Sequence, residues 1–158
     1  MIARICAVLV VVLAASAAAG CGGSEPSQAE FEAQVRESRD RTDAALANIG
    51  TSETFDQLLL RIRAASDEAR SAAEDLDELG APGDFDDDAG ELVTALRGLA
   101  DELSATADAI EDDPTFDEQR ITGLQFEFWT RTQEALTSLR EQGVEVPPLE
   151  PHALPEQS

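Results

Sequence analysis

Small and apolar side chains recur three and four residues apart in four separate segments of this 158-residue chain. This alternation is the period of an a/d seam between supercoiled helices. The stripes are Phe31, Val35, Ser38, Thr42, Ala45 and Ile49; Phe55, Leu58, Ile62, Ala65, Ala69, Ala72, Leu76 and Leu79; Phe85, Ala89, Leu92, Leu96, Leu99, Leu103, Thr106 and Ile110; and Ile121, Leu124, Phe128, Ala135 and Leu139. No segment alternates with a period of two, so the sequence predicts an all-α fold without strands.

The first two helices carry clear start and stop signals. Ser27 and Glu30 have the spacing of a capping box, in which each side chain bonds the backbone N–H of the other residue. Gly50 is expected to end the first helix, the second is expected to begin near Thr51 and Ser52, and Gly80 is expected to end it.

The third helix is expected to begin at Asp84, with that side chain as its cap, and to stop at Asp113-Pro114. The fourth is expected to open with a second capping box, Thr115-Phe116-Asp117-Glu118, and to end at Gly143. Three short connections favour antiparallel neighbours, so residues 27–143 are predicted to form an antiparallel four-helix bundle of up-down-up-down order. The Pro-rich tail, residues 144–158, is predicted to be extended or disordered.

Each predicted helix also has a phenylalanine near its first turn: Phe31, Phe55, Phe85 and Phe116. We interpret these side chains as hydrophobic staples that close the ends of the bundle.

The N-terminus predicts export from the cytoplasm. Arg4 precedes an apolar run over residues 5–19 that ends in small residues and is too short for a comfortable membrane span of about 20 residues. Residues 1–20 are therefore interpreted as a signal peptide.

The end of that signal, Ala18-Ala19-Gly20-Cys21, resembles the lipobox of bacterial lipoproteins, although Ala18 stands where the family usually has Leu. The resemblance implies that the Cys21 thiol receives a diacylglyceryl group, with residues 21–26 as a lipidated tether. The alternative is ordinary cleavage after Ala17-Ala18-Ala19. Removal of the signal takes Cys6 away and leaves Cys21 alone, and a lone thiol in an oxidising compartment is a liability that acylation removes.

Charge restricts the partners. The chain has 11 basic residues, all of them arginine, against 33 acids, for a net charge of −22. Such a charge gives solubility and repels anionic surfaces, so nucleic acid is not expected as a partner.

Two acidic clusters are candidate cation sites. Asp84, Asp86 and Asp88 alternate as in a calcium loop, but the glycine and the bidentate glutamate that such a loop needs are missing. The alternative for this cluster is a cap with further acids at the positive end of the helix dipole. A second acidic crowd, around residues 53–56 and 111–118, is a candidate surface for a divalent cation or a basic partner, or simply a solvated surface.

Phe126, Phe128 and Trp129 concentrate aromatic bulk in the predicted fourth helix. Phe126 and Trp129 are a candidate groove for an apolar ligand or a partner helix. The alternative is that these rings fill space opposite small residues on the other helices.

Catalytic constellations are not found in the predicted bundle. The only histidine, His152, lies in the tail and Cys21 lies in the tether, so neither a Ser-His-Asp set nor a ferritin-type metal site is expected. The sequence predicts no enzyme, no metal and no cofactor.

The chain resembles the small, uncharacterised helical lipoproteins of high-GC bacteria. This resemblance implies a lipid-anchored module on the extracytoplasmic face of the cell membrane with an envelope protein as partner. The alternative is a binding module for a small apolar ligand or a divalent cation.

Overall fold

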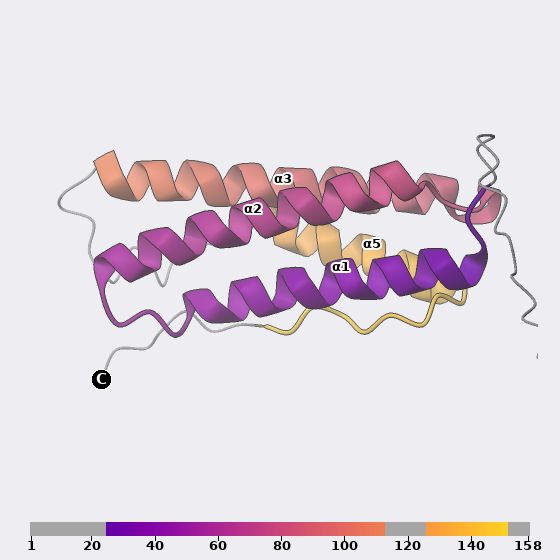
Figure 1. The fold of residues 1–158 in the computed structure, drawn as a ribbon, viewed down its shortest axis with the longest axis horizontal. Coiled ribbons are helices and arrows are strands. Elements are labelled where there is room, and N and C mark those ends of the chain that lie inside the picture. The colour runs from indigo at the N-terminus through magenta and orange to yellow at the C-terminus, as the bar shows by residue number, and fades with distance from the viewer. Residues whose placement is uncertain (1–24, 113–125, 152–158) are drawn as a thin grey trace, which may run out of the picture.

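The computed structural model of the chain describes residues 25–112 and 126–151. Within these two ranges the chain forms four α-helices, one 3₁₀ turn and no strand. The elements are α1 (Gln28–Ile49), α2 (Phe55–Leu79), the 3₁₀ turn η1 (Gly83–Phe85), α3 (Asp86–Asp112) and α5 (Glu127–Glu141). The helices lie alongside one another (Figure 1), which confirms the all-helical bundle predicted from the sequence.

Side-chain contacts between neighbouring helices fix the direction of each helix. In the pairs α1/α2, α2/α3 and α3/α5, residue numbers rise on one helix as they fall on the other, and the four helices lie along the long axis (Figure 1). The contacts are Arg41–Asp75 and Arg61–Asn48 between α1 and α2, Arg97–Asp77 and Arg63–Asp108 between α2 and α3, and Ser138–Asp88 and Phe128–Glu102 between α3 and α5.

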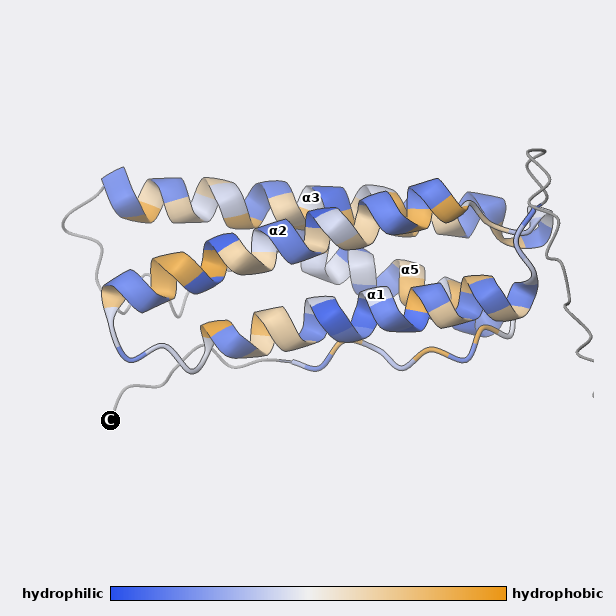
Figure 2. Ribbon diagram, in the orientation of Figure 1, coloured by the Kyte–Doolittle hydropathy of each residue, from blue (hydrophilic) through white to orange (hydrophobic). Residues whose placement is uncertain are grey.

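The bundle core consists of two apolar clusters. The first lies around Phe31, Leu92 and Leu136, and the second around Ile62, Leu99 and Ile110. Figure 2 shows the hydrophobic residues recurring along each helix between hydrophilic ones. The first three stripes therefore bury one face of α1, α2 and α3, as their spacing predicts. Of the fourth stripe, Ala135 and Leu139 are buried in α5, whereas Ile121 and Leu124 lie outside the described residues.

Two positions of the predicted stripes are shifted by one residue. Leu46 is buried in place of Ala45, and Ala107 is buried in place of Thr106. The reason is geometric, because an α-helix of 3.6 residues per turn drifts by about 20° per heptad from a strict seven-residue repeat. In both cases the residue buried instead is the next one along the chain.

Helix starts are confirmed in α1 and corrected in α2 and α3. The Ser27–Glu30 capping box is present. The second helix begins at Phe55 with Thr54 as its cap, because Ser52 folds back to donate to the Ile49 carbonyl at 2.8 Å. Asp84 does not cap α3; it lies inside η1, which no side chain caps.

The staple interpretation holds for two of the phenylalanines. Phe31 and Phe85 stack with ring centroids 5.7 Å apart and join the start of α1 to the connection between α2 and α3. Phe55 is 44% exposed, so for this residue the interpretation is wrong. Phe116, and with it the predicted capping box over residues 115–118, lies outside the described residues.

The last helix is held at its start by a neighbouring helix. Phe126 precedes α5 without a side-chain cap of its own. Instead the Glu102 carboxylate of α3 accepts hydrogen bonds from the N–H groups of Glu127, at 3.1 Å, and Phe128, at 2.9 Å. The first N–H groups of a helix have no partner within it, and an anion there also meets the positive end of the helix dipole. Glu102 therefore supplies the cap from outside the helix.

Of the two expectations for the tail, extended or disordered, residues 144–151 follow the extended one and pack against the helices. Val144, Val146 and Leu149 are 2%, 4% and 2% exposed and belong to the first core cluster. Residues 144–150, hereafter the C-terminal strap, follow an extended course along α1 (Figure 1). Prolines prevent this segment from forming a helix but leave it free to bury its apolar side chains in an extended form.

Candidate functional site

The predicted lipidation site, Cys21, lies outside the described residues. The structure does describe the pole at which α1 begins. The Phe31–Phe85 stack and the hydrogen bond of 2.7 Å from Ser138 to Asp88 place the starts of α1 and α3 and the end of α5 at this pole. None of the helices in residues 25–112 and 126–151 is long and apolar enough to cross a bilayer.

In the acidic cluster at Asp84, Asp86 and Asp88, one carboxylate has hydrogen-bond partners at the end of another helix. Asp88 accepts hydrogen bonds from Ser138 and from Gln142, so its carboxylate ties the first turn of α3 to the end of α5. In the described part of the chain, no three acidic, histidine or cysteine side chains are grouped so that they could hold a metal ion. The three acids lie in η1 and in the first turn of α3, near the positive end of the helix dipole. This is the position that the alternative interpretation, acids beside the helix start, gave them.

The acidic crowd at the opposite pole is partly neutralised by an arginine. Arg63 of α2 pairs with Glu111 and with Asp108, the latter at 3.6 Å. The hydrogen bond that Arg63 donates to Glu111 raises the pKa of Arg63 above its ordinary value. The residues of this crowd at 113–118 lie outside the described ranges.

Phe126 and Trp129 are partly buried against the core. Trp129 packs against both apolar clusters, whereas Phe126 packs against the second one only. The ring of Phe128, which lies between them in sequence, packs against Gly98 of α3. It does so closely enough that a Cβ atom at Gly98 would overlap the ring. The Arg131 guanidinium lies 4.8 Å from the centroid of the same ring. These contacts favour the alternative interpretation, in which the aromatic rings fill space opposite small residues.

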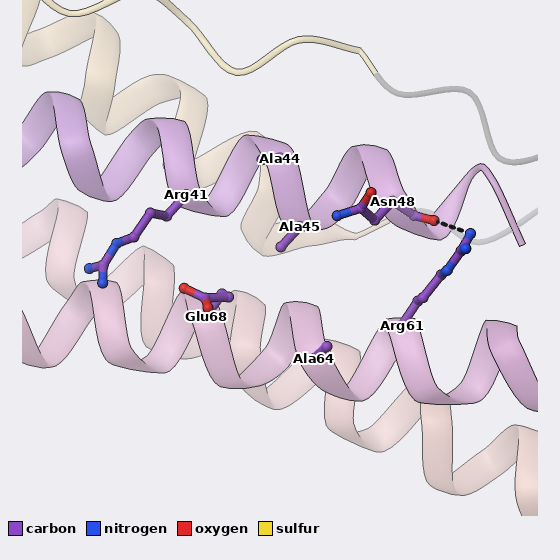
Figure 3. A pocket seen from close by; sticks show the side chains of 7 residues that line it. All are labelled: Arg41, Ala44, Ala45, Asn48, Arg61, Ala64 and Glu68. Carbon is purple, nitrogen blue, oxygen red and sulfur yellow. Dashed lines mark hydrogen bonds between the residues drawn. The ribbon is translucent and has the colours of Figure 1, made fainter.

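A concave surface that the sequence analysis did not find lies between α1 and α2 (Figure 3). It has a volume of about 420 Å³, and we call it the basic groove. Its lining residues are Arg41, Ala44, Ala45, Asn48, Arg61, Ala64 and Glu68. The small side chains of three alanines leave the space open, and an arginine stands at each end.

Both arginines of the basic groove are held in place by hydrogen bonds. Arg41 of α1 donates to Asp75 of α2 at 2.5 Å, and this hydrogen bond raises the pKa of Arg41 above its ordinary value. Arg61 of α2 donates to the Asn48 carbonyl at the end of α1, at 2.9 Å, and to the Thr51 hydroxyl. Arg61 therefore satisfies the negative, C-terminal end of the α1 dipole and bridges α2 to α1 at one end of the groove (Figure 3).

The same pair of helices carries a second, acidic groove beyond Arg41. It has a volume of about 460 Å³ and is lined by Gln34, Glu37, Asp75, Glu78 and Leu79. The surface between α1 and α2 thus changes from acidic, near the pole where α1 begins, to basic, near the pole where α1 ends. The only sequence signal for this arrangement is the set of alanines outside the buried stripes, at 44 and 64.

The structure also shows a covered surface between α1 and α5, beneath the C-terminal strap. It is formed by Val35, Ser38, Arg39 and Thr42 of α1, Leu92 and Leu96 of α3, and Thr132 and Leu136 of α5, with Leu149 of the strap lying on it. We call this surface the α1–α5 seam. The sequence signal for it is the apolar alternation of Val144 and Val146 ahead of Leu149, which the prolines obscure.

No protein family, no curated protein and no solved structure shows a match to this chain.

Proposed function

We propose that this chain is a non-catalytic module anchored by lipid at Cys21 to the extracytoplasmic face of the cell membrane, and that it acts by contact with another envelope protein. The signal-like N-terminus and the lipobox-like Cys21 support the location. The seven residues from Cys21 to Ser27 span at most roughly 25 Å when extended, which would keep the bundle close to the membrane.

The observation that carries the contact role is the basic groove. Its lining carries the guanidinium groups of Arg61 and of Arg41, the latter paired with Asp75, together with the Glu68 carboxylate, and its alanine floor is apolar. Complementary charge steers association and selects the partner, while apolar contact supplies affinity. The partner that fits is a protein segment with acidic side chains spaced to meet Arg41 and Arg61 and small apolar side chains between them.

Anchoring is tested by Cys21→Ser. The native chain is expected in the membrane fraction and to incorporate labelled acyl chains, whereas the variant is expected in the soluble fraction without label. A variant that stays with the membrane after salt washing would show that the anchor is not at Cys21.

The contact role is tested by crosslinking in cells followed by affinity capture. Ala64 is exposed in the groove, so Ala64→Glu fills the space and reverses the local charge without touching the core. The matched control is Ala105→Glu, the same change at an exposed position of α3. We expect the native chain and Ala105→Glu to capture the partner, and Ala64→Glu to lose it. Equal capture by all three chains would exclude the groove, and capture by none would exclude the contact role.

The same groove supports a second candidate function, the binding of a small apolar ligand that carries an anionic group. Three alanines offer an apolar floor and Arg41 and Arg61 offer charge partners at its ends. A medium-chain fatty acid would then raise the melting temperature of the native chain and of Ala105→Glu, and would leave that of Ala64→Glu unchanged. A melting temperature that no fatty acid raises would remove this candidate.

A further inference from the structure

The helices form hydrogen bonds with the backbone of the C-terminal strap. Arg36 donates to the Glu145 carbonyl at 2.8 Å and Arg39 to the Pro148 carbonyl at 2.9 Å. Further along the strap, the Gln133 side chain forms hydrogen bonds with both the carbonyl and the N–H of Leu149. The Asp43 carboxylate accepts a hydrogen bond from the N–H of Glu150 at 2.8 Å. Four side chains from α1 and α5 thus bind an extended backbone, as a neighbouring strand would. Such contacts accept any extended segment whose buried side chains fit.

The side-chain requirement of the seam is narrow. Only Val144, Val146 and Leu149 of the strap are buried, whereas Glu145, Pro147, Pro148 and Glu150 are exposed. Prolines suit the positions between the buried side chains. The seam contacts the backbone there through a carbonyl oxygen, which Arg39 binds at Pro148, and proline lacks only the backbone N–H. The seam therefore selects an extended segment with two apolar side chains before a proline pair and one directly after it.

The strap leaves polar groups of the seam without partners. The hydroxyls of Ser38 and Thr42 are buried, each residue being 1% exposed, and neither has a hydrogen-bond partner within the described part of the chain. With Leu149 they line a void of about 10 Å³. A buried hydroxyl without a partner costs free energy, so Leu149 is an imperfect occupant of this position.

We propose that the α1–α5 seam is a binding site for an extended, proline-containing peptide segment of another protein, and that the C-terminal strap occupies this site until such a segment displaces it. Gly143, with a φ of 101° that favours glycine, is the point about which the strap swings away. The displacing segment carries a hydrogen-bonding group that reaches Ser38 and Thr42. This inference goes beyond the proposed anchoring and groove contact and rests on neither.

The test measures the binding of a fluorescein-labelled peptide with the sequence of residues 142–151 to the full-length chain, kept soluble in mild detergent. Leu149→Asp places a charge in the buried position and releases the strap, which frees the seam in an otherwise intact chain. The matched control chain is Glu145→Ala, whose altered side chain is exposed. The control peptide carries Asp in place of its own leucine.

The peptide is expected to bind the Leu149→Asp chain at least about tenfold more tightly than the native and Glu145→Ala chains, because a site open for only a fraction of the time loses affinity by that fraction. The Asp-containing peptide is expected not to bind. A Leu149→Asp chain that keeps its helices, releases its strap and still fails to bind the peptide would overturn the proposal. No membrane is present, so this outcome leaves the anchoring proposal untouched.

If Leu149→Asp does not fold, hydrogen exchange on the native chain tests whether the strap detaches while the bundle stays folded. A strap that detaches on its own exposes the N–H groups of Leu149 and Glu150 at least about tenfold more often than those in the middle of α3. Equal protection of the strap and α3 would mean that the strap leaves only when the whole bundle unfolds, which would overturn the proposal. A native chain that sediments as a dimer, and becomes a monomer with Leu149→Asp, would also overturn it, because the occupant would then be the strap of a second copy.

Discussion

The side-chain amide of Gln133 forms two hydrogen bonds with the backbone of Leu149: its Nε2 donates to the carbonyl oxygen at 2.6 Å, and its Oε1 accepts from the N–H at 2.9 Å. A strand in a sheet would satisfy an extended neighbour in the same way. The Gln133 amide therefore supplies the hydrogen bonds that a neighbouring strand would give. It thereby holds Leu149, which follows Pro147 and Pro148, in the core of the helical bundle.

Gln133→Ala is expected to lower the free energy of unfolding by about 1–3 kcal/mol, because it leaves both backbone groups of Leu149 without partners in a partly buried place. Urea unfolding measures the loss, and hydrogen exchange locates it in residues 149–150. The control is Glu134→Ala, one residue further along α5 and exposed. Equal effects of the two substitutions would show that the amide does not hold the strap.

Glu102→Ala is expected to cost about 0.5–2 kcal/mol, the usual range for the loss of an N-terminal helix cap, because it removes the acceptor for two N–H groups of α5. Asp101→Ala, the control at the next residue, breaks only an exposed ion pair with Arg70 and is expected to cost about 0–1 kcal/mol. Amide exchange at Phe128 should rise with Glu102→Ala alone. A rise with both variants would contradict the role of Glu102 as a cap.

Two glycines of α3 are expected to respond to alanine in opposite directions. Gly98→Ala forces its methyl group into the Phe128 ring and should destabilise the chain by about 1–3 kcal/mol. A methyl group at Gly90 would meet no other atom within 4 Å, so Gly90→Ala should stabilise the chain by about 0.5–1 kcal/mol through helix propensity. Thermal unfolding of the two variants decides this. A harmless Gly98→Ala would mean that Phe128 does not rest on α3.

Acid should weaken the start of α1. The hydrogen bond from the Ser27 side chain is the main cause that lowers the pKa of Glu30 below its ordinary value of 4.5, with the backbone of Ser27 second. A lowered pKa in the folded state means that the stabilisation is fully present above pH 4.5 and is lost as the pH falls through the lowered pKa.

The measurement is the melting temperature of the native chain and of Ser27→Ala between pH 7 and pH 2. The native chain should melt higher at neutral pH, and the difference should shrink in acid as Glu30 takes up a proton. A difference that stays constant over this range would show that the carboxylate of Glu30 does not contribute to the cap.

Much of the bundle could be predicted from local patterns. The three-and-four spacing identifies the buried faces of α1, α2 and α3, and Ser27 with Glu30 marks the start of α1, because amphipathic periodicity and capping act within one helix. At Leu46 and Ala107 the buried residue is one position later than predicted, because a straight helix drifts by about 20° per heptad from a seven-residue repeat.

The candidate sites were harder to predict, because they depend on pairs of residues far apart in the chain. Arg41 and Arg61 reach across two helices, and nothing in the spacing of either shows that alanines leave a groove between them. Asp88 has the sequence pattern of a cation ligand, but the end of α5 supplies Ser138 and Gln142 as its partners.

The sequence by itself determined that the chain is helical, where α1, α2 and α3 bury their surfaces, and that the chain is strongly acidic. Tertiary structure alone decided that Glu102 caps α5 and that residues 144–150 close the core between α1 and α5. The physical reason is that helix periodicity is a property of neighbouring residues, whereas an extended segment with prolines has no internal hydrogen bonds. Its conformation is settled only by the side chains of other elements that bind its backbone.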